Sequence, residues 1–539
     1  MTQNIALKQT VADLISRHLN SYRQQEQSHI LAGLNVIADF QLNMATKSPA
    51  INLDEFQSHL SKINEKELRR RDEGVYYTPK DITEYIVANS FLNYVHKDNT
   101  QVYSTDYYIS TIGGENANKI KSAKVYDPTC GTAEFLLSAF YLKLAITSYS
   151  DDLDLLNIVS TIYGNDIATE SILLSKIRLF FAIYPLLKDA TLSVDLANIL
   201  NNNFTAFDFV LKSNFKPKFD IVIGNPPYVE YGKLPQKPST KFGNIYADVL
   251  KNSIDSLKSN GIIGFVIPIS FVATPRMKGI RDYSYSKLSK LFVLNFADRP
   301  DCLFDGVHQK LTILFGQKGK KKCTVYSSSY YHWYNDERKE LLNNATIVPV
   351  RPFDTFIPKI GNRFEQSVFN KIIHTQGETL DSISNEMTGG DSLYLNMRGC
   401  FWMKAFSFNP GSNEYRRFYC PVNLKSYLIS LLNSNLFFLY WTIVSDCWHI
   451  TGKELSGFRI PTNGIDFEAF GGLIENLERR LEKTKKYIGS KQTAYEYKHR
   501  DCKREIDDID TLLQPIFGLS DEEVEFLRNY KVRYRTSNG

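Results

Sequence analysis

Cysteine is scarce in this sequence and forms no pattern. Only 7 cysteines occur among 539 residues, they are scattered along the chain, and no C-x-x-C pair is present. An odd number of widely spaced cysteines excludes a zinc-ribbon type of site and a disulfide framework. A chain that does not depend on disulfides is typical of a reducing compartment, so we expect a cytoplasmic protein.

Long apolar runs and the common phosphate-binding motifs are also missing. The most apolar stretches, Gly261–Val272 and Leu436–Val444, are too short to cross a bilayer, and the polar N-terminus does not resemble a signal peptide. Neither G-x-G-x-x-G nor G-K-[ST] occurs, which argues against a dinucleotide fingerprint and a P-loop. The net charge of +5 permits a polyanionic partner but does not by itself predict one.

The stretch with the most chemistry in it runs from Phe219 to Tyr231 and reads FDIVIGNPPYVEY. Its apolar first half predicts a buried strand that stops at Gly224. The two prolines that follow fix φ and carry no N–H, so they stiffen a loop that presents the Asn225 amide, backbone carbonyls and the Tyr228 ring. Such a loop can receive a flat group bearing an NH2, for example the exocyclic amine of a base. The alternative is that it is only a turn, and the rest of the chain must decide.

A strand–turn–helix pattern lies earlier, in the stretch KVYDPTCGTAEFLL from Lys124 to Leu137. The strand ends at Asp127, a turn of small residues follows, and a helix begins near Ala133, which is the geometry of a nucleotide-type site. Small residues let a ligand approach the backbone closely. Because Asp127 favours a cation over a phosphate, the sulfonium and amino groups of S-adenosylmethionine suit this turn.

Two further acidic residues follow predicted strands. Asp166 ends the next strand, where an acidic side chain commonly hydrogen-bonds ribose hydroxyls. Asp208 stands between Phe207 and Phe209, a setting that suits an adenine ring and its amine. A solvated loop aspartate is an equally good interpretation of Asp208.

The alternation of strands and helices from Val125 onward predicts the fold class. About seven strands separated by helices indicate one α/β, Rossmann-like sheet. Residues 1–73 are predicted to be a helical segment, and the regular rhythm stops near residue 330. Residues 331–467 are then expected to form an α+β domain, and residues 468–539 a charged helical region.

Taken in order, these stretches resemble the gamma-class N6-adenine DNA methyltransferases of bacterial restriction–modification systems, over about residues 70 to 320 and more weakly to 530. That family has a Tyr-Tyr-Thr-Pro loop, a cofactor turn, two acids after strands, Asn-Pro-Pro-Tyr and an aromatic loop. This chain carries them as Tyr76, Tyr77, Thr78 and Pro79; Asp127, Pro128, Cys130, Gly131 and Phe135; Asp166; Asp208; Asn225, Pro226, Pro227 and Tyr228; and Phe304. Ala133 departs from the family's usual glycine, a mild change because both residues are small, and the Asp208 region matches only loosely.

The resemblance implies transfer of a methyl group from S-adenosylmethionine to the N6 amine of an adenine flipped out of double-stranded DNA. It implies that Asn225 and Pro226 accept the two N6 hydrogens and that Tyr228 and an exposed Phe304 stack on the base. The implied cofactor residues are Tyr76, Tyr77, Thr78, Pro79, Asp127, Pro128, Cys130, Gly131, Phe135, Asp166, Ile167, Asp208 and Asn225, with no metal. Residues 74–330 would be the methyltransferase domain and 331–467 a DNA target-recognition domain.

Other acceptors remain open. An Asn-Pro-Pro-Tyr loop also suits RNA adenine or a protein glutamine amide, since a planar amide resembles the adenine edge. An inactive, DNA-binding subunit is a further alternative, although the intact motifs argue against it. We expect double-stranded DNA as the partner, a separate cognate restriction endonuclease as a second candidate partner, no membrane, and a monomer.

Overall fold

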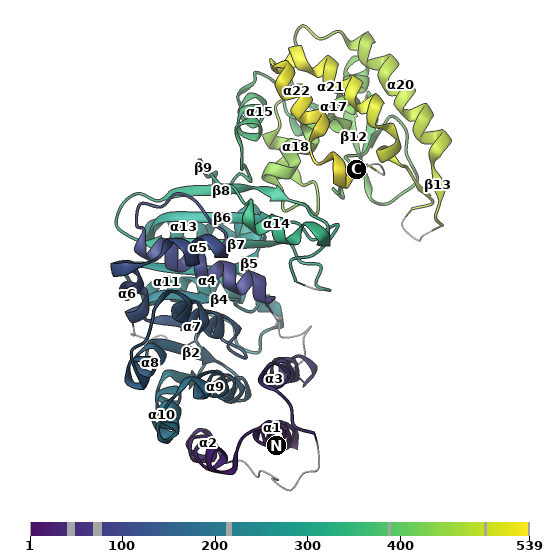
Figure 1. Ribbon diagram of the computed structural model, residues 1–539. Coiled ribbons are helices and arrows are strands. Elements are labelled where there is room, and N and C mark those ends of the chain that lie inside the picture. The colour runs from purple at the N-terminus through teal and green to yellow at the C-terminus, as the bar shows by residue number, and fades with distance from the viewer. Residues whose placement is uncertain are drawn as a thin grey trace.

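The structure is a computed structural model, and it describes residues 2–39, 49–67, 78–211, 218–304, 306–385, 390–489 and 493–536. Figure 1 shows three successive parts along the chain: N-terminal helices, a central sheet flanked by helices, and a C-terminal lobe. Tyr76 and Tyr77, two of the expected cofactor residues, lie outside the described residues.

The N-terminal helices pack below one end of the sheet. They are α1 (Thr2–Leu19), α2 (Gln24–Ile37) and α3 (Leu53–Glu67). Val11, Ile15 and Leu19 recur at helical spacing and are fully buried, so one face of α1 forms part of the core. α2 packs on α10 and α3 packs on α9, which ties this segment to the sheet's own helices.

Nine strands of the described residues form one sheet in the order β3-β2-β1-β4-β5-β7-β6-β8-β9. β7 and β9 are antiparallel to their neighbours and the other pairings are parallel. The α/β, Rossmann-like fold expected from the sequence is confirmed. The strands are β1 (Val125–Asp127), β2 (Ile162–Asp166), β3 (Phe204–Ala206), β4 (Phe219–Gly224), β5 (Leu257–Pro268), β6 (Leu288–Phe296), β7 (Leu311–Lys318), β8 (Thr324–Tyr331) and β9 (Val348–Val350).

The expected number of about seven strands was too low, because β8 and β9 add two strands to the sheet after β7 in the chain. β8 contains three consecutive serines and therefore lacks the apolar run of a buried strand. Ser327 and Ser328 are nevertheless buried, and they hydrogen-bond Asn295 of β6. Hydrogen bonds between buried serines and Asn295 thus take the place of the apolar contacts by which a buried strand is recognised in a sequence.

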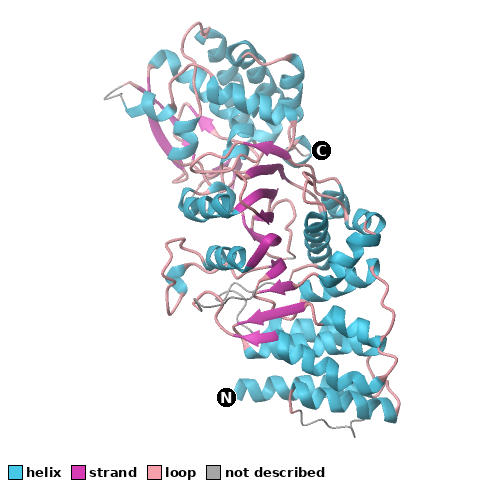
Figure 2. Cartoon of the chain, turned by 90° about the vertical axis from the view of Figure 1, so that its left-hand side faces the viewer, coloured by secondary structure: helices cyan, strands magenta, loops and turns pink. Residues whose placement is uncertain are grey.

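Helices lie on both sides of the strands (Figure 2). α4 and α7 pack on each other, and α4 also packs on β4 and β5. Residues 105–122 form two short helices: Ser104 caps α5 by accepting a hydrogen bond from the Tyr107 N–H, and α6 follows. The helices are α4 (Lys80–Val95), α5 (Thr105–Thr111), α6 (Gly114–Ser122), α7 (Glu134–Ile146), α8 (Asp152–Val159), α9 (Thr169–Ile183), α10 (Ser193–Asn203), α11 (Ile245–Ser256), α12 (Ser270–Ala273) and α13 (Lys278–Lys287).

The C-terminal lobe combines an antiparallel sheet, in the order β11-β10-β12, with helices. Its strands are β10 (Asp391–Asn396), β11 (Ala405–Phe406) and β12 (Tyr415–Cys420), with a hairpin of β13 (Lys486–Tyr487) and β14 (Tyr495–Glu496). Its helices, with those that lead into it, are α14 (Arg338–Asn343), α15 (Arg363–His374), α16 (Leu380–Asn385), α17 (Lys425–Asn433), α18 (Asn435–Val444), α19 (Gly452–Gly457), α20 (Phe467–Thr484), α21 (Lys503–Phe517), α22 (Asp521–Asn529) and α23 (Val532–Arg535).

No single helix of the described residues is both long and apolar enough to cross a membrane. One bent pair, Val422–Asn433 with Asn435–Val444, reaches the required length and composition only when its two halves are taken together.

Direct contacts join the C-terminal lobe to the sheet where β5 ends. The Ile357 N–H donates to the Val272 carbonyl, and the Lys453 ammonium donates to the carbonyls of Ala273 and Val444. Arg338 forms an ion pair with Asp81 at the start of α4. The lobe is therefore attached beside the edge at which the parallel strands end.

Candidate active site

Four expected site residues stand in a row at one edge of the sheet. Asp127 and Asp166 are the last residues of β1 and β2, while Asp208 and Asn225 follow the ends of β3 and β4. The sheet order β3-β2-β1-β4 makes these strands neighbours. Because neighbouring strands lie about 4.8 Å apart, these residues stand side by side at one edge of the sheet.

Asp127 is buried in the turn after β1. Its Oδ1 accepts a hydrogen bond from the Thr129 N–H at 3.0 Å. A Cβ added to Gly224 would lie 2.7 Å from the same oxygen, so only glycine lets the end of β4 approach this carboxyl. The glycine before Asn225 thus brings the turn after β1 and the turn after β4 into contact, a link that neither motif reveals alone.

Burial raises the pKa of the Asp127 carboxyl well above its ordinary value. The Thr129 N–H opposes this shift, and the nearby Asp166 carboxylate adds to it. No lysine or arginine of the described residues forms an ion pair with Asp127. A buried carboxyl without a cationic partner fits the positive charge that S-adenosylmethionine carries.

Asp166 fastens the turn to the second strand. Its Oδ2 accepts from the Gly131 N–H at 3.0 Å, and its Oδ1 accepts from the Ala168 N–H at 2.9 Å. The adjacent Ile167 side chain is 71% exposed, an unusual position for a large apolar residue. The pair therefore offers a carboxylate and an apolar surface side by side, as a ribose and a base require.

Asp208 has a local structural role in this structure. Its Oδ1 accepts hydrogen bonds from the N–H groups of Val210 and Leu211, which closes a turn. Asn165 of β2 donates to the Phe207 carbonyl and accepts from its N–H, so the turn stays close to β2. The assignment of Asp208 to the cofactor remains a proposal.

Helix α7 begins under strain. Ala133, the residue that precedes α7, has φ +70° and ψ +30°, and Gly131 has φ +52°. A left-handed conformation costs a non-glycine residue about 1–2 kcal/mol. The expectation that alanine is a mild replacement for the family's glycine was therefore wrong, because it considered side-chain size and not φ.

The other expected residues of this turn are packed inside the protein, and their assignment to the cofactor stays a proposal. Cys130 and Phe135 are buried, and the Pro128 carbonyl accepts a hydrogen bond from the Asn165 amide at 3.0 Å. Arg178 of α9, which the sequence did not single out, ion-pairs with Glu134 at the start of α7 and donates to the Thr132 carbonyl. Both contacts hold the turn against α9.

Asn225 is oriented by two side chains. Its Nδ2 donates to the Thr78 hydroxyl at 3.0 Å, and its Oδ1 accepts from the Tyr228 hydroxyl at 2.5 Å. These partners fix the amide so that its oxygen points toward Tyr228. Thr78 is buried and directly precedes Pro79, so the described end of the Tyr-Tyr-Thr-Pro loop does meet the Asn-Pro-Pro-Tyr loop.

The Tyr228 ring is half-buried, and its hydroxyl also lies 3.0 Å from the Val266 carbonyl of β5. Of the two prolines between Asn225 and Tyr228, Pro226 is buried and Pro227 is half-buried. The loop is thus fixed at both ends, by Thr78 on one side and by β5 on the other.

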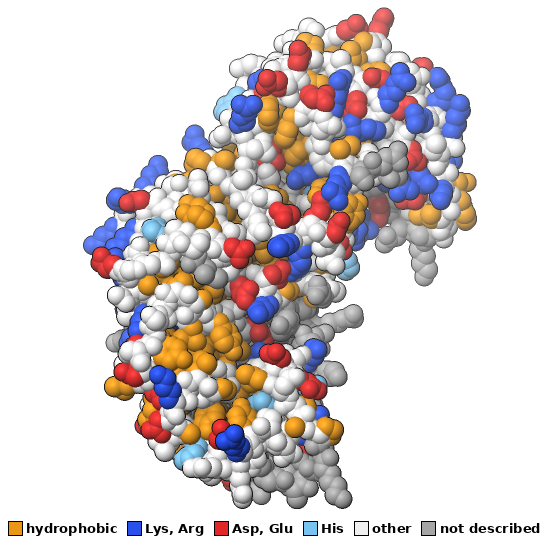
Figure 3. Space-filling view, in the orientation of Figure 1, with side chains coloured by type: hydrophobic (Ala, Val, Ile, Leu, Met, Phe, Trp, Pro, Cys, Tyr) orange, Lys and Arg blue, Asp and Glu red, His pale blue; other side chains and the backbone are white. Residues whose placement is uncertain are grey.

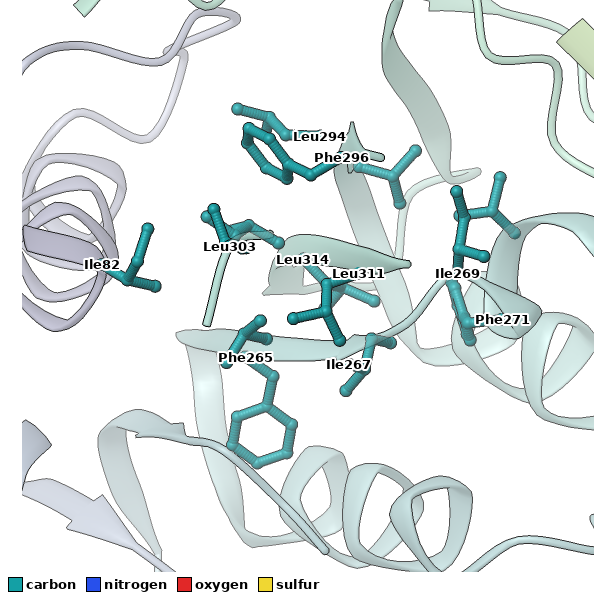
Figure 4. Packing of buried hydrophobic residues seen from close by; sticks show 14 of the residues in the cluster. Ile82, Phe265, Ile267, Ile269, Phe271, Leu294, Phe296, Leu303, Leu311 and Leu314 are labelled. Atoms are coloured by element: carbon teal, nitrogen blue, oxygen red, sulfur yellow. The ribbon is translucent and has the colours of Figure 1, made fainter. Parts of the chain in front are cut away.

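Phe304 does not lie where the sequence predicted. Its side chain is only 1% exposed, so the expectation of an exposed stacking aromatic was wrong. Its neighbour Leu303 is buried as well, and Figure 4 shows Leu303 among side chains of β5, β6 and β7. The Arg338 guanidinium further holds the loop by donating to the Leu303 carbonyl.

The middle of the chain matches a known protein family. Residues 160–299 match the model of the Eco57I restriction-modification methylase. The chain is also 26% identical over 275 residues to the Type II methyltransferase M.BanIII of Aneurinibacillus aneurinilyticus, covering 48% of this chain and 41% of the relative. It is 29% identical over 173 residues to the Type II methyltransferase M.PstI of Providencia stuartii, covering 30% and 34%. The chain therefore aligns with less than half the length of these relatives.

Among solved structures, the type IIG restriction endonuclease BpuSI aligns with 98% of this chain and 78% of its own chain, at a TM-score of 0.44 and 13% sequence identity. The family match and the curated relatives confirm the expected relationship to restriction–modification methyltransferases. They also confirm S-adenosylmethionine as the expected cofactor.

Proposed function

We propose that this protein transfers a methyl group from S-adenosylmethionine to the N6 amine of an adenine flipped out of double-stranded DNA, at one short sequence. The observation that supports this most strongly is the Asn225 amide, whose oxygen is aimed at Tyr228 by Thr78 and by the Tyr228 hydroxyl. An amide oxygen beside an aromatic ring matches an amine attached to a flat base.

Asn225 and the backbone of the next residue would activate the acceptor. The adenine amine is a poor nucleophile because its lone pair is delocalised into the ring. Hydrogen bonds from its two N–H groups to Asn225 Oδ1 and the Pro226 carbonyl would localise that lone pair on nitrogen. Tyr228 would stack on the base, and base–aromatic stacking is worth about 1–3 kcal/mol, comparable to the few kcal/mol that extrusion costs.

The neighbouring strand ends would hold the cofactor. Asp127 would receive its positive charge, and Asp166 with Ile167 would receive the nucleoside part. When bound, S-adenosylmethionine supplies the methyl group and leaves as a neutral thioether, so the acceptor nitrogen loses one proton overall. The close approach of β4 to Asp127 at Gly224 keeps the cofactor half next to Asn225, and alignment of two bound reactants is itself a large part of catalysis.

Charge on the C-terminal lobe supports DNA as the substrate. Lysine and arginine side chains gather on the upper lobe in Figure 3. In the sequence of this lobe, Arg479 and Lys483 of α20 and Lys486 of β13 are exposed. The lobe is attached beside the sheet edge at which the parallel strands end, so its exposed cations suit contacts with DNA phosphates. We infer that residues 331–467, with the helices that follow, provide target recognition.

A transfer assay tests the proposal. Purified protein is incubated with labelled S-adenosylmethionine and, in separate reactions, with bacterial DNA lacking adenine methylation, with total RNA, or with a protein extract. Label should enter only the DNA. Label in RNA or protein alone would support one of the other acceptors, and cofactor binding without any transfer would support an inactive subunit; either result contradicts the proposal.

A further inference from the structure

One tryptophan of this chain is exposed and three are not. The sequence has 4 tryptophans, all in the described residues; Trp333, Trp402 and Trp441 are between 1% and 7% exposed. Trp448 is 37% exposed. A single exposed aromatic needs no explanation by itself, so its position and its fixation must decide whether it has a role.

Trp448 is held in place by its own loop. The backbone N–H of Trp448 donates to Asp446 Oδ1 at 3.0 Å. The carbonyl of the next residue, His449, accepts hydrogen bonds from Trp441 Nε1 and the Ser445 hydroxyl. Cys447 supports the loop in a left-handed conformation, with φ +62°. The ring is therefore presented by a defined loop structure.

The Trp448 ring lies at the edge of the sheet where the parallel strands end. The Lys310 ammonium lies 3.2 Å from the centroid of the Trp448 ring. Lys310 directly precedes β7, and its carbonyl accepts a hydrogen bond from the Ile269 N–H, just beyond the end of β5. In the order β4-β5-β7, Lys310 is two strand spacings, about 10 Å, from the strand that carries Asn225.

A buried ion pair fixes Lys310 under the ring. Its ammonium lies 3.1 Å from Asp298 Oδ1, and both side chains are less than 8% exposed. Asp298 also holds the loop that carries Phe304. The Asp298 carbonyl lies 3.4 Å from Cys302 Sγ and 3.4 Å from His308 Nδ1. An exposed aromatic from the C-terminal lobe thus stands over the loop whose own aromatic is buried.

We propose that Trp448 stacks on a base of the duplex next to the adenine that is extruded toward Asn225. This inference rests on the proposed function and adds to it a DNA-contacting residue of the C-terminal lobe. Proteins that unstack DNA use apolar side chains against the exposed faces of neighbouring bases, and enzymes that act on a base within a duplex create such faces by flipping. No described residue accepts a hydrogen bond from the Trp448 indole N–H, so this donor is available to the DNA backbone.

Intrinsic fluorescence tests the proposal without any mutation, because Trp448 is the exposed tryptophan. Acrylamide quenching of the full-length protein should decrease when a duplex that the protein methylates is added. An equimolar duplex of random sequence should protect less.

Substitutions test it a second way. Trp448→Ala should raise the Kd for the methylated duplex about tenfold, the typical effect of losing one base–aromatic contact, with the Kd for S-adenosylmethionine unchanged. Trp448→Phe, which keeps a smaller ring over Lys310, should give an intermediate Kd. The matched control is Tyr107→Ala, a 40% exposed aromatic on α5, which should change neither constant.

Two failures are distinguishable. If the wild-type protein methylates DNA while Trp448→Ala binds the duplex normally and the duplex does not protect the fluorescence, the role of Trp448 is contradicted and the proposed function stands. If the wild-type protein transfers no methyl group to DNA, the proposed function is contradicted, and this inference with it.

Discussion

The two halves of the candidate site are built in different ways. In the cofactor half, Asp127 and Asp166 accept hydrogen bonds from backbone N–H groups, those of Thr129, Gly131 and Ala168. In the acceptor half, Asn225 is held by side chains, one of them 147 residues away in the sequence. Sequence motifs identify residues of both halves, but they do not show that Thr78 contacts Asn225 or that Asp166 holds the turn at Gly131.

The largest expected effect lies in the acceptor half. Asn225→Ala should lower kcat by about 10²–10³-fold, the loss typical of removing one preorganised group that acts on the reacting atoms. The Kd for S-adenosylmethionine, measured by calorimetry, should stay within about twofold, because Asp127 and Asp166 are held by backbone N–H groups. Tyr228→Phe keeps the ring and removes the hydroxyl, so its kcat should fall less. Equal loss of cofactor binding in both variants would contradict the separation of the two halves.

The next effect lies in the cofactor half and depends on pH. Because the folded-state pKa of Asp127 is raised, the folded protein holds this proton more tightly than the unfolded chain. The stability that this provides is present at low pH and is lost as the pH rises. Asp127→Asn should therefore raise Tm at pH 8 and have little effect on Tm at low pH.

The same substitution should weaken cofactor binding about tenfold or more at pH 8, because a charged hydrogen-bond partner is lost. Titration calorimetry of both proteins measures this, and the wild-type affinity should rise with pH. A Tm that falls equally at all pH values would instead indicate a purely structural role for Asp127.

A smaller effect should be confined to DNA. Lys483→Gln with Lys486→Gln removes two exposed cations of the C-terminal lobe, so the slope of log Kd against log salt should become shallower by about 2. Cofactor affinity should not change. The control replaces two exposed lysines outside that lobe, Lys97 and Lys188, and an equal change of slope in the control would exclude a specific DNA surface on the lobe.

The smallest effect concerns the turn of the cofactor half. Ala133→Gly should raise the free energy of unfolding by about 0.5–1 kcal/mol, because glycine adopts φ +70° without strain but loses more entropy on folding. Ala139→Gly, within α7, should act in the opposite direction. Chemical denaturation of both variants checks the sign, and destabilisation by Ala133→Gly would show that the turn does not carry this strain.

These differences explain what could be predicted from the sequence. The ends of β1, β2 and β4 were found because each is an apolar run stopped by an acid or by Gly224. The burial of Phe304 was missed because it is a matter of tertiary packing: the neighbouring Leu303 lies among side chains of β5, β6 and β7. β8 was not counted because its buried face is made of serines that pair with Asn295. Trp448 was not weighed because its nearness to Lys310 is a tertiary contact across 138 residues of chain, 448 minus 310.

The most direct test of the whole account is to map the methylated base. Bacterial DNA without adenine methylation is incubated with the wild-type protein and S-adenosylmethionine, and the modified positions are read by single-molecule sequencing, with Asn225→Ala as the blank. The account predicts N6-methyladenine at one repeated short motif and none in the blank. Methylated cytosine, or modification by both proteins alike, would contradict it.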